Sequence, residues 1–293
     1  MRDRVVIGGA LRQAGGSFAG PARGQGRGRR LWRGAVWATV APMPITRTLE
    51  SGVAVLTLDM GRGNAIDYPF MEALGAALDA ALEGGARAVV LTSRGKVFCG
   101  GLDLVTIFDY DPAEMGRYHD AFGDTFCKVL SYPRPVVAAI NGHALAGGAI
   151  LAMACDVRVS APGPFFIGLN EVAIGLSFPA SAYEIARRAT PDAAAPAVFL
   201  EGKRFSPEEA HRAGLIHQIA GERGVVAEAT EAAARLSAGG LAAIADTKAD
   251  LVAPVLARIE STAQARRGRF LERWFTPETR ARIGALRDQL AKR

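Results

Sequence analysis

Apolar positions along this chain follow two periods, one typical of β-strands and one typical of α-helices. Short runs of consecutive apolar residues, many of them valine, favour buried strands at 53–58, 87–92 and 136–140. Around these runs, apolar residues recur every three or four positions, which predicts helices over 69–82 and 112–131. Because strand and helix signals alternate, the pattern predicts an α/β fold.

The second half of the chain carries mostly helix signals. Gly147-Gly148 opens an apolar helix, and Ser206 to Glu209 has the form of a capping box, with serine at the N-cap and proline in the first turn. Charged, alanine-rich sequence with helical spacing fills most of 222–293. No repeat or long linker follows residue 43. We therefore expect a core over 43–238 and a helical section over 239–293.

Composition changes the picture mainly at the N-terminus. Residues 1–42 hold eight arginines, nine glycines and one acid, which gives this segment a charge of +7. Since the whole chain has a charge of +6, the remaining residues have a net charge of −1. A segment so rich in glycine and arginine buries too little apolar surface to fold, so we predict a disordered extension over 1–42. The rest of the chain is nearly neutral, so it lacks the positive charge that proteins use to bind nucleic acid.

Several protein classes are excluded by what the sequence lacks. No apolar run approaches the roughly 18 residues that a membrane-spanning helix needs, which excludes a transmembrane protein. We also predict no membrane partner. Cys99, Cys127 and Cys155 are odd in number and far apart, which excludes a disulfide scaffold and suits a reducing, cytoplasmic location. The four histidines form no ligand-like cluster, so no metal site is predicted.

Candidate chemistry lies in two glycine-containing turns. The turn at 98–104 follows one strand, and the turn at 141–148 follows another strand and leads into a helix. Such turns can leave backbone N–H groups pointing outward, and two of them side by side would form an oxyanion hole. Taken alone, each turn is more often structural. Neither matches the phosphate-binding patterns of nucleotide sites.

Glu171 is the third candidate feature. It is the one acid in an otherwise uncharged stretch from Pro162 to Tyr183. A carboxylate in apolar surroundings has a raised pKa, which makes it a better base near neutral pH. The composition of this stretch is also compatible with a solvent-exposed loop glutamate that has no catalytic role.

The order and spacing of these elements resemble the enoyl-CoA hydratase/isomerase family, also called the crotonase superfamily. Five ordered motifs carry the resemblance, at Gly63–Ile66, Gly100–Leu104, 138–156, Asn170–Gly175 and 209–216. The resemblance implies a spiral of ββα units that assembles as a homotrimer or a dimer of trimers. It also implies that the helical section over 239–293 contributes to trimerisation.

The resemblance further implies the chemistry of the site. Family members bind acyl-CoA thioesters and stabilise an enolate with two backbone N–H groups, which by motif position are those of Leu102 and Gly147. Glu171 is the implied base. Contacts to substrate and CoA are implied for Gly100, Gly101, Asp103, Leu104, Gly148 and Asn170. Coenzyme A is part of the substrate, so no separate cofactor and no metal is implied. Asp103 as a helix cap and Asn170 as a turn residue are the alternative interpretations.

The reaction depends on one position near the second turn. Hydratases of this family usually use two glutamates, and the first would fall three residues after Gly147, where this chain has Ile150. Δ3,Δ2-Enoyl-CoA isomerases keep only the second glutamate, and the chain also resembles them in having Asn170 before Glu171. The resemblance therefore favours an isomerase of fatty acid metabolism. A hydratase or other CoA-thioester lyase, and a non-catalytic acyl-CoA-binding relative, are the open alternatives.

Overall fold

The computed structural model describes residues 45–292, and its first part is a series of four strand–strand–helix units. The first unit contains β1 (Ile45–Glu50), β2 (Val53–Leu58) and α1 (Tyr68–Glu83). The second contains β3 (Ala88–Ser93), β4 (Val97–Cys99), the short α2 (Leu104–Ile107) and α3 (Pro112–Leu130). The third contains β5 (Val136–Ile140), β6 (His143–Leu145) and α4 (Gly147–Ala154). The fourth contains β7 (Val157–Ser160), β8 (Ile167–Gly168), the 3-10 turn η1 (Val172–Ile174) and α5 (Ala180–Ala189).

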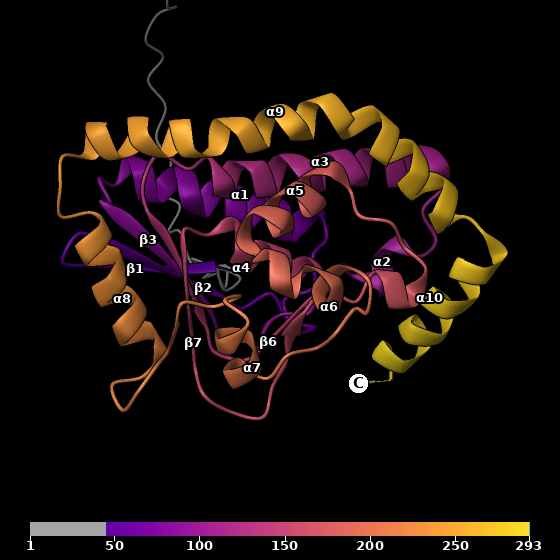
Figure 1. The fold of residues 1–293 in the computed structure, drawn as a ribbon, viewed down its shortest axis with the longest axis horizontal. Coiled ribbons are helices and arrows are strands. Elements are labelled where there is room, and N and C mark those ends of the chain that lie inside the picture. The colour runs from indigo at the N-terminus through magenta and orange to yellow at the C-terminus, as the bar shows by residue number, and fades with distance from the viewer. Residues whose placement is uncertain (1–44, 293) are drawn as a thin grey trace, which may run out of the picture. The chain divides into compact units, whose positions relative to one another are not determined.

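Mostly helical sequence follows the four units (Figure 1). Its elements are η2 (Asp192–Ala194), α6 (Ala195–Phe199), α7 (Pro207–Arg212), β9 (Gln218–Ile219), α8 (Val225–Leu236), α9 (Leu241–Trp274) and α10 (Pro277–Leu290). The expected helical C-terminal section is therefore confirmed, whereas its trimerisation role and the boundary near 238 stay predictions. The predicted disordered extension over 1–42 lies outside the described residues. Among residues 45–292, no helix is both long and apolar enough to cross a membrane.

The strands of the repeating units are divided between two sheets. The larger sheet has the order β1-β2-β3-β5-β7-β9, and the smaller has the order β4-β6-β8. Apart from the antiparallel pair β1 and β2, neighbouring strands are parallel. From the second unit to the fourth, the first strand joins the larger sheet and the second joins the smaller one. This repeating path is the ββα spiral that the family resemblance implied.

The predicted long elements agree with the structure. The apolar runs correspond to β2, β3 and β5, and the two periodic segments correspond to α1 and α3. The capping box at the start of α7 is present, because the Ser206 hydroxyl accepts from the Glu209 N–H and the Glu209 carboxylate accepts from the Ser206 N–H. A second capping box, from Asp111 and Glu114, starts α3. Side chains near the helix starts thus fix where these helices begin.

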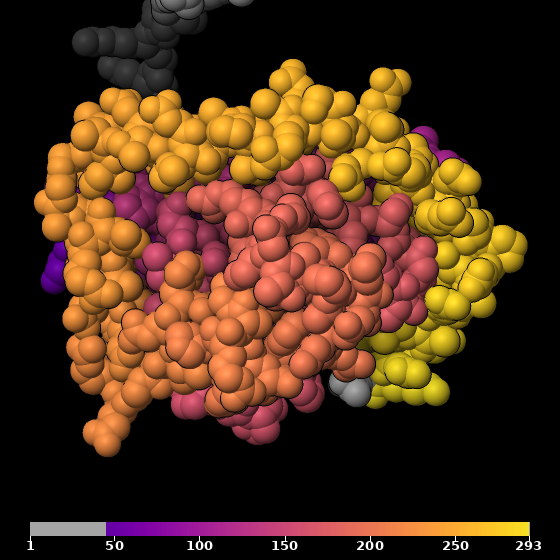
Figure 2. All heavy atoms as spheres, viewed as in Figure 1, coloured from indigo at the N-terminus to yellow at the C-terminus, as the bar shows by residue number. Residues whose placement is uncertain are grey.

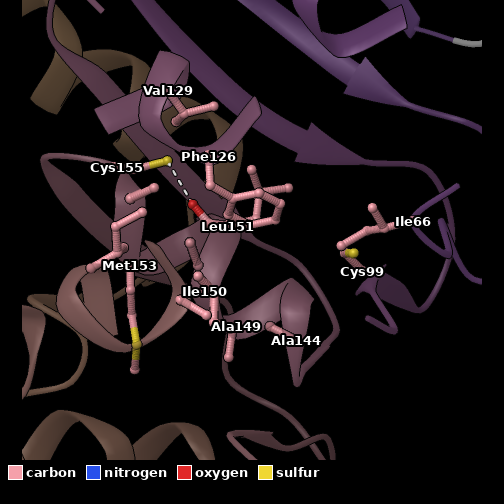
Figure 3. Packing of buried hydrophobic residues seen from close by; sticks show 14 of the residues in the cluster. Ile66, Cys99, Phe126, Val129, Ala144, Ala149, Ile150, Leu151, Met153 and Cys155 are labelled. Atoms are coloured by element: carbon pink, nitrogen blue, oxygen red, sulfur yellow. Dashed lines mark hydrogen bonds between the residues drawn. The ribbon is translucent and has the colours of Figure 1, made fainter. Parts of the chain in front are cut away.

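Helix α4 lies inside the core rather than on its surface. All eight of its residues are buried, as its uniformly apolar sequence requires. Figure 3 shows Leu151 and Cys155 close to Phe126 and Val129 of α3, with the Cys155 thiol donating to the Leu151 carbonyl. Because α4 is packed on all sides, the turn that precedes it is held in a fixed place.

Helix α9 passes α3 and α5 (Figure 1). It runs along the top of the view, and α10 lies at the right (Figure 2). Buried Lys248 donates to Asp156 at 2.7 Å, and Arg258 donates to the buried carboxylate of Glu184 at 2.8 Å. These contacts dock α9 onto the core. Its Phe270 is consequently buried, with 3% of its surface exposed.

Candidate active site

The two glycine turns and the Glu171 loop meet at one edge of the small sheet. Each of the three segments begins where one strand ends: residues 100–102 follow β4, residues 146–148 follow β6, and residues 169–171 follow β8. These strands are parallel neighbours, so their carboxyl ends lie at the same edge. The sheet thus brings together three segments that are far apart in sequence.

The two turns contact each other so closely that side chains are excluded. Gly101 has a φ of +93°, and a Cβ there would lie 2.9 Å from the Cβ of Ala146 and 3.2 Å from the nitrogen of Gly147. A Cβ on Gly148 would lie 1.9 Å from the carbonyl oxygen of Cys99. Ala146 itself has a φ of +49°, a conformation that alanine rarely adopts. The close approach of the two turns therefore explains why positions 101 and 148 are occupied by glycine.

The two turns contain the backbone N–H groups of Leu102 and Gly147. Within residues 45–292, neither the Leu102 N–H nor the Gly147 N–H donates a hydrogen bond in the loops and turns. Gly147 is the first residue of α4, where N–H groups lack helical partners and the helix dipole is positive. The Leu102 turn is held by Ile66, whose N–H donates to Gly101 at 2.8 Å and whose carbonyl accepts from Asp103 at 3.0 Å.

Leu102, Gly147 and Glu171 line one cavity of about 30 Å³. The other lining residues are Tyr118, His119, Phe122, Ile150, Leu176, Pro179, Ala182 and Phe270. Among the described residues on this wall, Glu171 is the one carboxylate. The volume is enough for about two water molecules. Because most of the wall is apolar, an N–H dipole directed into this cavity would stabilise negative charge more strongly than it would in water.

Glu171 is held at the start of the 3-10 turn η1. Its carbonyl oxygen accepts from the N–H groups of Ile174 at 3.2 Å and Leu176 at 3.0 Å, which fixes its backbone. Its residue surface is 9% exposed, and its Oε2 has no hydrogen-bond partner among residues 45–292. Burial raises the pKa of Glu171 to about 7. The carboxylate is therefore a stronger base than an exposed glutamate, yet it is still substantially ionised at neutral pH.

Four other predicted contact residues support the turns and do not line the cavity. Gly101 and Gly148 allow the close approach described above, and the N–H of Gly100 donates to Gly63 at 2.9 Å. Leu104 is buried at the start of α2. Their contacts to a substrate stay predictions.

Asp103 and Asn170 differ in how their side chains are used. The Asp103 carboxylate accepts from the N–H groups of Val105 and Thr106 at the start of α2, and it also pairs with Arg62 at 3.1 Å. This is the helix-cap arrangement. The Oδ1 of Asn170 is buried and has no partner within the described chain. Asn170 therefore keeps a free acceptor beside Glu171, and a substrate contact for either residue stays a prediction.

Several lining residues come from helices to which the sequence assigned no function. Tyr118, His119 and Phe122 lie on α3, and Phe270 lies on α9. His119 had one signal, because it is a titratable residue on the apolar face of the helix predicted over 112–131. Phe270 had none, since only tertiary packing brings α9 to the cavity.

Cys99, which lies in the first turn, has no reactive character. It is fully buried, and its thiol donates to the Asn64 carbonyl at 3.0 Å. Burial raises the pKa of Cys99 to about 12, so the nucleophilic thiolate is not formed near neutral pH. The geometry thus assigns the candidate chemistry to Glu171 and the two amides.

Comparison with known proteins relates this geometry to solved structures and curated sequences. The human mitochondrial delta3-delta2-enoyl-CoA isomerase has a similar structure, with a TM-score of 0.78 and 28% identity over 85% of this chain and 98% of that one. A putative enoyl-CoA hydratase of Thermus thermophilus is 39% identical over 178 residues, which is 59% of this chain and 70% of that protein. Human mitochondrial enoyl-CoA delta isomerase 1 is 32% identical over 189 residues, which is 63% of this chain and 62% of that protein.

The architecture is therefore the α/β crotonase fold, as the sequence predicted. The model of the enoyl-CoA hydratase/isomerase family matches residues 48–282, and the chain belongs to that family. Enzymes of this family act on acyl-CoA thioesters. Since similar proteins include both hydratases and isomerases, the choice between the two reactions depends on the residues of the site.

Proposed function

We propose that the chain is an enoyl-CoA isomerase that converts a 3-enoyl-CoA into the conjugated 2-enoyl-CoA. The observation that carries this proposal is the composition of the cavity wall. Among the described residues on that wall, Glu171 is the one carboxylate, and Ile150 occupies the position expected for the second glutamate of a hydratase. A 1,3-proton shift needs one base, whereas hydration also needs a group that activates water.

In this proposal the thioester oxygen accepts hydrogen bonds from the N–H groups of Leu102 and Gly147. The Glu171 carboxylate removes a proton from C2, and the electron pair of the broken C–H bond forms a dienolate whose charge rests on the thioester oxygen. Neutral Glu171 then donates the proton to C4, and the double bond ends between C2 and C3. Each well-placed N–H group contributes roughly 3–4 kcal/mol to transition-state stabilisation.

Ile150 supports the isomerase over the hydratase. Its side chain is 1% exposed and lies on the same cavity wall as Glu171. An isoleucine neither accepts nor donates a proton, and its apolar surface disfavours a water molecule at that place. The conjugated product is therefore expected to leave without being hydrated.

The coenzyme A part of the substrate needs cations near its phosphates. A second hollow, of about 230 Å³, is lined by Arg62, Arg94 and Lys96 together with Asp59, Gly61, Gly63, Asn64 and Val97. It adjoins the first glycine turn, because Gly63 also accepts the hydrogen bond from Gly100. We expect the phosphates in this hollow, with coenzyme A entering only as part of the substrate. Gly100, Gly101, Asp103, Leu104, Gly148 and Asn170 are the proposed contacts to the rest of the substrate.

Two substrates test the reaction, and both are followed by the ultraviolet absorbance of the conjugated thioester. The isomerase proposal predicts a gain of absorbance with 3-hexenoyl-CoA and little loss with crotonyl-CoA. Loss from crotonyl-CoA that is faster than gain from 3-hexenoyl-CoA would instead favour a hydratase. Binding of both thioesters without either change would favour the non-catalytic acyl-CoA-binding relative.

A variant tests the role of Glu171 directly. Glu171→Gln is expected to lower isomerase turnover by roughly 100-fold or more, because the amide cannot accept the C2 proton. Glu72→Gln is the matched control, since Glu72 is exposed on α1. Turnover of Glu171→Gln close to that of the wild type would contradict the assignment.

Assembly and location are part of the same proposal. We expect a homotrimer or a dimer of trimers with contacts from α9 and α10, in the cytoplasm, without nucleic acid or membrane partners. Sedimentation analysis of the full chain measures the assembly directly.

A further inference from the structure

His119 is a second buried titratable residue on the cavity wall. It lies on α3 with 8% of its surface exposed, and its Nε2 has no hydrogen-bond partner within residues 45–292. Oε2 of Glu171, which lines the same cavity, also has no partner there. Unpaired buried polar atoms cost free energy. Because both residues line one cavity with room for about two water molecules, a water molecule there is a shared candidate partner for the two atoms.

The other ring nitrogen of His119, Nδ1, contacts a side chain that is partly exposed to solvent. Nδ1 lies 3.1 Å from Oδ1 of Asp120, which also accepts from Nε of Arg267 at 2.8 Å. Because a carboxylate only accepts hydrogen bonds, Nδ1 carries the ring proton and Nε2 keeps a free lone pair. The Asp120 side chain is 53% exposed. A continuous set of polar groups therefore runs from the cavity to solvent.

The charges around the ring favour this arrangement at neutral pH. Partial burial opposes ionisation of Asp120, but hydrogen bonds from Arg267 and His119 outweigh it and lower the pKa of Asp120. Burial lowers the pKa of His119, and Arg267 adds to this effect while Asp120 opposes it. Tyr118, the neighbouring residue, has a pKa raised well above its usual value by burial and stays neutral. Glu171 is the other ionisable group that faces the same cavity.

We propose that His119 and Asp120 form a proton relay that connects the Glu171 carboxyl group to solvent. The inference rests on the proposed role of Glu171 as the base. After Glu171 has taken a proton from C2, its carboxyl group donates a proton through a cavity water to Nε2 of His119. The imidazolium releases its Nδ1 proton to Asp120, which passes it to bulk water. Glu171 is then an anion again, no electrons are transferred, and the reverse path brings a solvent proton back for C4.

The size and polarity of the cavity show what such a relay adds to the one-base proton shift. The space holds about two water molecules, and its wall is otherwise formed largely by apolar residues such as Phe122, Leu176 and Phe270. Once a bound thioester covers the site, bulk water has little access to Glu171, whereas in the proposed relay one cavity water stays between Glu171 and His119. The relay lets the buried carboxyl group exchange its proton while the dienolate is still bound. It therefore predicts that much of the hydrogen delivered to C4 comes from solvent.

Isomerisation of 3-hexenoyl-CoA in D₂O tests the relay, with deuterium at C4 of the product measured by mass spectrometry. The wild type is expected to place solvent deuterium at C4 in most of the product. His119→Asn keeps an amide near the Nδ1 position but lacks Nε2, and it is expected to lower the deuterium content at least threefold. Asp120→Asn, on the exposed end of the relay, should act in the same direction. His211→Asn, on the exposed face of α7, is the control and should leave the content unchanged.

A saturated thioester separates the relay from the isomerisation. Hexanoyl-CoA cannot isomerise, but its C2 protons exchange with D₂O if Glu171 and the relay act. Exchange at least tenfold slower in His119→Asn and Asp120→Asn supports the relay. Equal exchange and equal C4 labelling in the wild type and both variants overturn it while the isomerase function stands. Relay-dependent exchange without isomerisation overturns the proposed function alone, and no exchange by the wild type overturns both.

Discussion

Replacing Glu171 by glutamine is expected to change stability and activity in opposite directions. The native protein holds this carboxyl group in a buried cavity wall where its charged form is poorly solvated. Glutamine has nearly the shape of the protonated acid but never ionises. The variant therefore loses the proposed base and, at the same time, removes the free-energy cost of a buried charge.

The size of the stability effect follows from the pKa. Burial raises the pKa of Glu171 from the usual 4.5 to about 7. Each pKa unit corresponds to about 1.4 kcal/mol, so ionised Glu171 lowers the free energy of unfolding by about 3 kcal/mol at most. Below pH 4.5 the acid is protonated in both the folded and unfolded states, and the cost is absent. It grows as the pH rises from 4.5 to 7 and is constant above pH 7.

Thermal unfolding of wild type and Glu171→Gln between pH 4.5 and 9 measures this difference. The two melting temperatures should nearly coincide at pH 4.5, and the variant should melt roughly 6–12 °C higher above pH 7. Glu72→Gln should show no such pH-dependent gap, since Glu72 is exposed. A constant difference across the pH range, or a variant less stable than the wild type at pH 8, would refute the burial argument.

Contacts and pKa shifts described above lead to four further expected outcomes. The isomerase kcat/KM should rise with pH up to about 7 and then level off, because only ionised Glu171 removes a proton; a flat profile would contradict this. Gly148→Ala should lower the free energy of unfolding in urea by about 2 kcal/mol or more, because the added Cβ would overlap the Cys99 carbonyl oxygen. An unchanged unfolding midpoint would argue against the close contact. Lys248→Met should lower the free energy of unfolding by about 2 kcal/mol in the same assay, since Asp156 is left without its cation. Equal stability of the variant and the wild type would show that the ion pair is unimportant. In the folded protein, Cys99 should resist iodoacetamide at pH 8, as mass spectrometry would show; rapid labelling would contradict its burial.

The long elements of the fold were predictable from pattern because each is long enough to show a period. The helix predicted over 112–131 is α3 (Pro112–Leu130), and the apolar run at 136–140 is β5. The strands β4, β6 and β8 contain only two or three residues each, too few for any periodicity. They are nevertheless the strands that organise the site. Their place was indicated by the ordered motifs beside them rather than by hydrophobic pattern.

The site was predictable in the part that local sequence specifies. Motif order indicated Leu102, Gly147 and Glu171, and the structure brings these three residues to one cavity, although their chemical roles stay predictions. His119 and Phe270 were missed for a physical reason. Their approach to the cavity depends on how α3 and α9 pack, which is a property of the whole fold. A short window of sequence shows only that His119 is a titratable residue on an apolar helix face, and it shows nothing for Phe270.

Phe270 has a consequence for how the protein is made. All four ββα units precede it, so a nascent chain can form both sheets and both glycine turns before α9 leaves the ribosome. Such a chain lacks one apolar part of its cavity wall, so we expect its Glu171 carboxylate to be more accessible to water. The apolar wall around Glu171 is therefore complete only near the end of translation, and a chain that stops just before Phe270 would contain the four ββα units with an incomplete cavity wall.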